Sequence, residues 1–273
     1  MKRILILLVT IHLLAFSGFS QAQRSIVVGS PEYQSAKENG TLDQYDLVLD
    51  LHQATLNGAA NSNLPALPPP SATNKSRDIE CDCYVEPDNS YTTALNACDD
   101  CVMETAVALP FTFNFYGTPY NEIYINNNGN VTFGENLTTF SSTAFPSNNR
   151  RIVAPFWADV DTRGAGRVVY KIIGNAIYIN WHNVGYFNNQ NDKINNFQLI
   201  LSDGIDPAIP DANNVAFCYG DMQWTTGSAS QGTNGFGGTP ATAGANKGDN
   251  SLYFLIGRFD HPGTDYDGAL GAN

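Results

Sequence analysis

The sequence has few basic residues and few long helical patterns, and these shortages exclude several classes of protein. Of its 273 residues, 14 are Lys or Arg and 26 are Asp or Glu, so the formal net charge is −12. Nucleic-acid binding depends on clustered positive charge, and we therefore exclude it. After the first 22 residues, no apolar run approaches the length of a membrane span. The many Gly (24), Phe (15) and Tyr (13) residues instead favour an all-β protein.

The sequence also lacks compact catalytic motifs. It contains no G-x-S-x-G, H-E-x-x-H or P-loop pattern. A glycoside hydrolase needs only two separated carboxylates, such as Asp159 with Glu122 or Asp221, but no spacing supports either pair. The Gly-rich stretch 226–248 lacks the Lys-Ser/Thr ending of a phosphate-binding loop, and we interpret it as a long ordered loop. These absences predict that the chain is not an enzyme.

Residues 1–22 have the pattern of a secretory signal peptide. Lys2 and Arg3 precede an apolar run, and small residues lead to a cleavage site after Ala22. Loss of the two basic residues changes the formal charge from −12 to −14. We therefore expect a secreted or cell-surface protein without a transmembrane segment in its mature chain.

Three further segments follow the signal peptide. Residues 23–56 carry a helix signature, with Ser30 as the N-cap, Pro31 at the first helical position and Gly40 just past the end, followed by a weak strand signal. Residues 57–77 are rich in proline and small polar residues, which predicts a linker or an extended arm. Residues 78–273 form the main predicted domain.

Short strand signals recur through this main domain. The run Phe111 to Phe115 alternates apolar and polar residues, as a half-buried strand does. Asn128-Gly129 and Gly174-Asn175 each lie between two strand signals, which predicts two tight hairpins. The fold class we predict is all-β: an antiparallel β-sandwich with a short N-terminal helix and an extended Pro-rich arm.

The cysteines fall into two close pairs and one isolated residue. Cys81 and Cys83 are followed by Cys98 and Cys101, a spacing compatible with a zinc site or with disulfides. Disulfides are the expected use in an exported protein. We predict two bridges between the pairs, 81–98 with 83–101 or 81–101 with 83–98, and the sequence does not choose between them. Cys218 is predicted to be a buried free thiol.

Asp159 and Asp161 follow the apolar run 152–157 and share one face if the strand continues. Together with turn carbonyls they are candidate ligands for Ca²⁺, which prefers oxygen atoms. The segment lacks the further acids of an EF-hand. The alternative, which we favour, is structural: the carboxylates cap the amides of the turn 162–166 and pair with Arg163 or Arg167.

Four blocks of sequence, in this order, resemble the nidogen-like extracellular (NIDO) domain family. They are residues 109–117 (LPFTFNFYG), 125–134 (INNNGNVTFG), 154–161 (APFWADVD) and 223–227 (QWTTG). The resemblance covers about residues 109–257 and excludes the N-terminal helix, the Pro-rich arm and the cysteine pairs. Such modules occur in matrix proteins and in secreted surface proteins of bacteria, and their association with matrix and cell adhesion implies a non-enzymatic module.

We therefore expect an extracellular cell-matrix adhesion or interaction module whose partner is an extracellular protein or glycan. The alternative is a carbohydrate-binding module or a glycoside hydrolase. Family members usually continue past the position at which this sequence ends, so we also expect the chain to be part of a longer multidomain protein. No cofactor other than calcium is predicted, and the resemblance supplies no binding residues.

Overall fold

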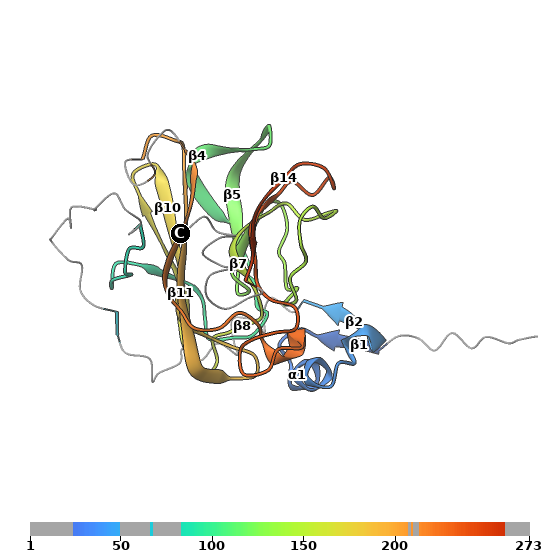
Figure 1. The fold of residues 1–273 in the computed structure, drawn as a ribbon. Helices are drawn as coiled ribbons and strands as arrows, with labels where there is room; N and C mark the ends of the chain where they lie inside the picture. Colours follow the sequence, from blue (N-terminus) through green and yellow to red (C-terminus); the bar gives the residue numbers. More distant parts are fainter. Residues whose placement is uncertain (1–23, 50–65, 68–82, 207–208, 210–212, 260–273) are drawn as a thin grey trace, which may run out of the picture.

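The fold is a β-sandwich with a small N-terminal unit at one end (Figure 1). The computed structural model describes residues 24–49, 66–67, 83–206, 209 and 213–259. The predicted signal peptide, most of the Pro-rich arm and Cys81 lie outside these residues. The described elements are β1 (Arg24–Val27), α1 (Pro31–Glu38), η1 (Leu42–Gln44), β2 (Tyr45–Val48), β3 (Thr92–Leu95), β4 (Val107–Phe115), β5 (Thr118–Asn126), β6 (Asn130–Thr132), β7 (Ile152–Trp157), β8 (Val160–Asp161), β9 (Arg167–Ile173), β10 (Ala176–Tyr186), β11 (Gln190–Ser202), β12 (Val215–Met222), η2 (Ser228–Ser230), β13 (Thr242–Asn246) and β14 (Tyr253–Arg258).

Two antiparallel sheets pack on each other to form the sandwich, as the sequence predicts. One has the strand order β12-β11-β10-β9-β3, with β8 also paired to β10. The other has the order β14-β13-β7-β6-β5-β4. In β4 every second residue is buried, so the alternation of Phe111, Phe113 and Phe115 places all three rings in the core. Trp181 of β10 stacks on Phe197 of β11 in the same core, with ring centroids 5.1 Å apart.

The two predicted hairpins form, with one difference in loop length. Ile173 pairs with Ala176, so Gly174-Asn175 is the two-residue loop that the sequence predicts. Asn126 pairs with Asn130, so the first hairpin has the three-residue loop 127–129. This longer loop is buried: Trp181 donates its indole N–H to the carbonyl oxygens of both Asn126 and Asn127.

The Gly-rich stretch 226–248 is only partly the loop that we predicted. Its last part forms β13, a strand inside the second sheet that pairs with both β7 and β14. Apart from Thr242, the residues of β13 are Ala, Gly and Asn, which have little tendency to form strands, so β13 carries no apolar strand signal. Gly244 has no room for a side chain, because a Cβ at this position would lie 2.2 Å from the carbonyl oxygen of Phe254.

The N-terminal unit consists of α1 and the parallel pair β1–β2. Ser30 caps the helix by accepting a hydrogen bond from the Tyr33 amide at 3.1 Å, and Gly40 adopts a positive φ of 66° after the last turn. Both roles were predicted from the sequence. In Figure 1 the unit lies at one end of the sandwich, near β8 and η2. No helix among the described residues is long and apolar enough to cross a membrane.

Candidate functional site

A buried lysine joins the N-terminal unit to the sandwich. Lys37, in the last turn of α1, places its Nζ atom 2.5 Å from Asp100 Oδ2, 2.7 Å from Asp159 Oδ1 and 2.9 Å from Asp99 Oδ2. None of the four side chains has any exposed surface. The ring of Phe187 lies 4.3 Å from the same nitrogen. We call Lys37, Asp99, Asp100 and Asp159 the acidic centre.

The acidic centre contains more negative than positive charge. Burial, and next the neighbouring Asp100, raise the pKa of Asp99 well above its ordinary value. Burial also raises the pKa of Asp159 to about 7, although the Lys37 ammonium opposes this effect. Burial alone would lower the pKa of Lys37, but the three carboxylates outweigh it and raise that pKa. The centre is therefore a place where carboxyl groups hold protons at pH values at which exposed carboxyl groups do not.

Asp161 has a different cation. Arg163 donates to it from the backbone N–H at 3.0 Å, from Nε at 2.9 Å and from a terminal guanidinium nitrogen at 2.5 Å. The backbone N–H of Asn189 adds a fourth hydrogen bond at 2.8 Å. These contacts are the ones expected if Asp161 has a structural role rather than a calcium-binding one: it caps the turn and pairs with Arg163. Asp159 differs, because its partner is Lys37, more than a hundred positions away in the sequence.

The described residues contain one group of three acids that could share an ion, and it includes Asp159 but not Asp161. Among the described residues, the group of acids whose oxygen atoms lie within 4.8 Å of one another is Asp99, Asp100 and Asp159. Asp99, Asp100 and Lys37 were not predicted from the sequence as site residues. The signal that was available is the pair of acids enclosed between Cys98 and Cys101. Lys37 lies in a segment outside the family resemblance, and the sequence of α1 does not indicate that this lysine contacts distant aspartates.

The buried loop 127–129 positions the carboxylates. Asn128 donates from Nδ2 to Asp100 Oδ1 at 2.6 Å and accepts from the Val160 amide at 3.0 Å. The side-chain oxygen of Asn127 accepts a hydrogen bond from the Asp100 amide at 3.1 Å. The Asn-rich block that resembles the NIDO family is therefore the polar support of the acidic centre.

The disulfides differ from the predicted pairing. The structure joins Cys83 to Cys218 and Cys98 to Cys101. The crosswise pairings that include 83–101 or 83–98 were therefore wrong, and Cys218 is not a free thiol. The reason is topological: Cys218 lies on β12, and the chain at Cys83 runs beside that strand, where its sulfur lies 3.9 Å from the Phe217 carbonyl oxygen. The spacing of cysteines along the chain contains no information about this contact.

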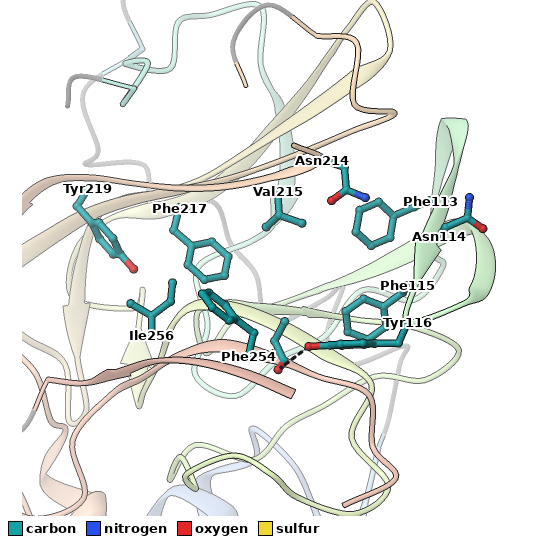
Figure 2. Close-up of a pocket in the computed structure, with 11 residues that line it drawn as sticks. Phe113, Asn114, Phe115, Tyr116, Asn214, Val215, Phe217, Tyr219, Phe254 and Ile256 are labelled. Carbon is teal, nitrogen blue, oxygen red and sulfur yellow. Dashed lines mark hydrogen bonds between the residues drawn. The ribbon is translucent and has the colours of Figure 1, made fainter. Parts of the chain in front are cut away.

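A second feature is an apolar pocket at the edges of the two sheets (Figure 2). It has a volume of about 430 Å³ and lies between β4, β12 and β14, each the last strand of its sheet in the part described. Phe254 is 62 % exposed at its margin. None of the described residues that line it is charged. The lining residues are Phe113, Asn114, Phe115, Tyr116, Asn214, Val215, Phe217, Tyr219, Ala245, Phe254 and Ile256.

The polar groups of this pocket are mostly engaged within the protein. The Tyr219 hydroxyl donates to the carbonyl oxygen of Pro155 at 2.7 Å, and burial raises its pKa. The Tyr116 hydroxyl donates to the carbonyl oxygen of Ala245 at 3.4 Å, the dashed line in Figure 2. What the pocket presents to a ligand is therefore chiefly aromatic and aliphatic carbon.

The carboxylates considered for glycoside hydrolysis do not meet in a cleft. Asp159 has no exposed surface, whereas Glu122 and Asp221 are exposed on β5 and β12. A retaining or inverting glycosidase needs both carboxyl groups to face the scissile bond. Asp159, enclosed behind α1, cannot reach a glycan in this structure.

The fold is an antiparallel β-sandwich with two disulfides, and the relatives given below make it an extracellular adhesion or interaction module. The chain belongs to the NIDO-related family, whose family model matches residues 83–255. Human alpha-tectorin is 31 % identical over 183 residues, a match that covers 56 % of this chain and 8 % of alpha-tectorin. Dendrite extension defective protein 1 of Caenorhabditis elegans is 27 % identical over 174 residues, covering 56 % of this chain and 14 % of that protein.

Nidogen of Drosophila melanogaster is 29 % identical over 144 residues, which cover 42 % of this chain and 10 % of nidogen. The chain thus spans a small part of each of these relatives. No solved structure matches it significantly. Alpha-tectorin and nidogen are extracellular matrix proteins, and the chain is a secreted or cell-surface protein. The resemblance to the NIDO family drawn from the sequence is thereby confirmed.

Proposed function

We propose that the chain is a non-enzymatic adhesion module of the cell-matrix type, which binds an extracellular protein at the apolar pocket. The observation that carries this proposal is an aromatic pocket of about 430 Å³ at the margin of β4, β12 and β14. Exposed apolar surface of this kind, gathered at one place, is typical of interaction sites. The absence of charge among the described lining residues argues against an ionic or phosphorylated ligand.

The partner that this pocket fits is an extended protein segment with an apolar or aromatic side chain. Such a side chain would enter between Phe217 and Phe254, whose rings face the pocket in Figure 2. The segment's backbone would run beside β14, an edge strand of the described sheet with unpaired N–H and C=O groups. A sugar would need more free hydrogen-bonding groups than Asn114 and Asn214 supply, which favours protein over glycan.

Two observations support a non-enzymatic role. The pocket contains no carboxylate, histidine or lysine among its described lining residues to act as a general acid or base. The buried carboxylates, conversely, have no access to a substrate. The relatives alpha-tectorin and nidogen are non-enzymatic matrix proteins, and they support the same conclusion.

The organisation that accompanies this function is also a proposal. Residues 1–22 would direct secretion, 57–77 would link the N-terminal unit to the binding domain, and 78–273 would form that domain. Since the relatives are about ten times the length of the matched region, we propose that the chain is part of a longer multidomain protein. Calcium at Asp159 and Asp161 remains a proposal as well.

The experiment compares two surface variants of the secreted protein. Binding to a panel of purified extracellular matrix proteins is measured by biolayer interferometry for wild type, Phe254→Ser and Leu252→Ser. Phe254 lines the pocket, whereas Leu252 is 45 % exposed on the same segment and does not line it. Removing one buried aromatic contact of about 1.5–3 kcal/mol should weaken binding about 10–150-fold for Phe254→Ser. Leu252→Ser should bind like wild type.

A glycan array with the same three proteins distinguishes protein binding from the alternative function, carbohydrate binding. Sugar binding that Phe254→Ser abolishes would replace the protein-binding proposal with the carbohydrate-binding one. Matrix-protein binding that is equal in wild type and Phe254→Ser would place the interface elsewhere and refute the role of the pocket. Hydrolysis of any glycan that is lost in Asp159→Asn would refute the non-enzymatic proposal.

A further inference from the structure

The acidic centre holds a primary amine against a carboxyl group in a space closed to solvent. Lys37 Nζ and Asp100 Oδ2 are 2.5 Å apart, and neither side chain is exposed. The rings of Phe140 and Phe187 each lie 4.3 Å from the nitrogen. An amine and a carboxyl group held in contact without water react far faster than the same groups free in solution. The absence of bulk water also favours the product of a reaction that releases water.

We propose that Lys37 and Asp100 form an intramolecular isopeptide bond, with Asp99 relaying a proton. The bond would join α1 covalently to the loop that Cys98 and Cys101 close. It is an amide between Lys37 Nζ and Asp100 Cγ, and its formation releases one water molecule. The proposal is independent of the pocket and of the partner that the pocket binds.

Asp100 is the acyl donor because both of its oxygens have hydrogen-bond donors besides lysine. Asn128 Nδ2 donates to Oδ1 at 2.6 Å, where negative charge develops when the amine attacks Cγ. The Tyr33 hydroxyl donates to Oδ2 at 2.9 Å, the oxygen that leaves. Asp159 also contacts Lys37, but its Oδ2 atom has no hydrogen-bond partner in the described structure.

Asp100 is also held in place by its backbone. It adopts a φ of 58°, an uncommon value for a residue other than glycine, within the loop closed by the Cys98–Cys101 disulfide. Its amide donates to the Asn127 side chain. A carboxyl group fixed in this way loses little further freedom when it reacts.

Asp99 is the proton relay because it contacts the amine through both oxygens. Lys37 Nζ donates to Asp99 Oδ1 at 3.0 Å and to Oδ2 at 2.9 Å. Burial raises the pKa of Asp99, which favours the protonated form that such a relay uses. A neutral carboxyl group can give a proton from one oxygen while it accepts another proton on the second oxygen.

The reaction then balances without a co-reactant. The Lys37 ammonium gives one proton directly to Asp100 Oδ2, 2.5 Å away, which leaves a neutral amine beside a neutral acid. Nζ attacks Cγ of Asp100, the N–C bond forms and the Cγ–Oδ2 bond breaks. The departing hydroxyl receives a second proton from Nζ through Asp99 and leaves as water. The ammonium and the carboxylate have become an amide and water, and Asp99 is unchanged.

The test is mass spectrometry of the secreted wild-type protein after reduction and denaturation. The expected mass is that of the sequence, from its measured N-terminus, minus one water. Trypsin does not cleave after an acylated lysine, so residues 25–75 should appear as one peptide joined to residues 78–150, which contain Asp100. An internal succinimide at an aspartate also loses water, but it leaves Lys37 open to cleavage.

Three results would overturn the proposal. Folded protein with the full sequence mass and a free peptide 25–37 would show that no bond forms. A bond to peptide 152–163, which contains Asp159, would refute Asp100 as the acyl donor. A bond that forms equally fast in Asp99→Asn would refute the relay. We expect this variant, which keeps the size of the side chain, to fold without the bond, whereas Asp46→Asn, a change at an exposed carboxylate of β2, should form it fully.

Discussion

The buried loop 127–129 allows a sharp comparison between two glycines that both occupy hairpin turns. Gly129 has a φ of 71° and Gly174 a φ of 57°, so an alanine at either position adopts the left-handed conformation. That conformation costs about 1–2 kcal/mol for a residue with a Cβ atom. At Gly174 there is no atom within 4 Å of the new Cβ, so we expect this cost alone.

At Gly129 the same substitution meets the backbone of β7. The added Cβ would lie 1.8 Å from the carbonyl oxygen of Phe156 and 2.8 Å from its carbonyl carbon, so the loop or the strand must move. Movement breaks the hydrogen bonds from the Phe156 amide to Gly129 and from the Ala158 amide to Asn128. Each contributes about 0.5–1.5 kcal/mol. We therefore expect Gly129→Ala to lose about 2–5 kcal/mol in total, including the backbone cost.

The assay is urea denaturation of both variants and wild type, with thermal melting as a second measurement. For a protein of this size, 1 kcal/mol corresponds to about 2–4 °C, so Gly129→Ala should melt about 4–20 °C below wild type. Gly174→Ala serves as the matched control and should melt about 2–8 °C below it. Equal losses for the two variants would refute the inference that the loop 127–129 is packed against β7.

Three further predictions concern the cysteines, the acidic centre and calcium. Cys83 and Cys218 are 135 positions apart, so replacing both with serine should cost about 5 kcal/mol by the loop-entropy estimate; peptide mapping of wild type that finds Cys218 as a free thiol would refute the pairing. The pKa of Asp159 is about 7 when folded and 3.8 ordinarily, so the folded state binds more protons between these values and loses stability as the pH rises from about 4 to 7. Chemical denaturation at several pH values should show this loss in wild type, on the order of a few kcal/mol, and a smaller loss in Asp159→Asn, in which Asp99 with its raised pKa still titrates. Because Asp159 has no exposed surface and Asp161 is already paired with Arg163, we expect millimolar Ca²⁺ and chelator to leave the wild-type melting temperature unchanged; a rise with Ca²⁺ would support the calcium hypothesis for Asp159 and Asp161.

Most of the sandwich could be predicted because its strands carry local signals. The alternation in β4 and the Asn-Gly and Gly-Asn turns require only short-range chemistry, and the structure has both hairpins. The strand β13 could not be predicted, because its Ala, Gly and Asn residues have little strand tendency, and Gly244 is required by the close approach of the Phe254 carbonyl oxygen on β14.

The acidic centre depends on contacts between distant parts of the chain, and only some of its residues were predicted from the sequence. Asp161 and Arg163 are two positions apart, so their pairing was foreseeable. Lys37 and Asp159 are 122 positions apart, and nothing near either residue indicates the other. The same is true of Cys83 and Cys218, since a disulfide depends on which strands lie side by side.

The position of α1 has a consequence for where the folding unit of this protein begins. The region that defines the family starts at Cys83, and Lys37 lies outside it. A fragment restricted to that region would retain Asp99, Asp100 and Asp159 and would lose Lys37, which contacts all three, so water would have to reach carboxyl groups that have no exposed surface in the longer chain. The family match defines the conserved sandwich, whereas the contacts of its buried carboxyl groups with Lys37 define a longer folding unit, which includes a helix from outside the family region.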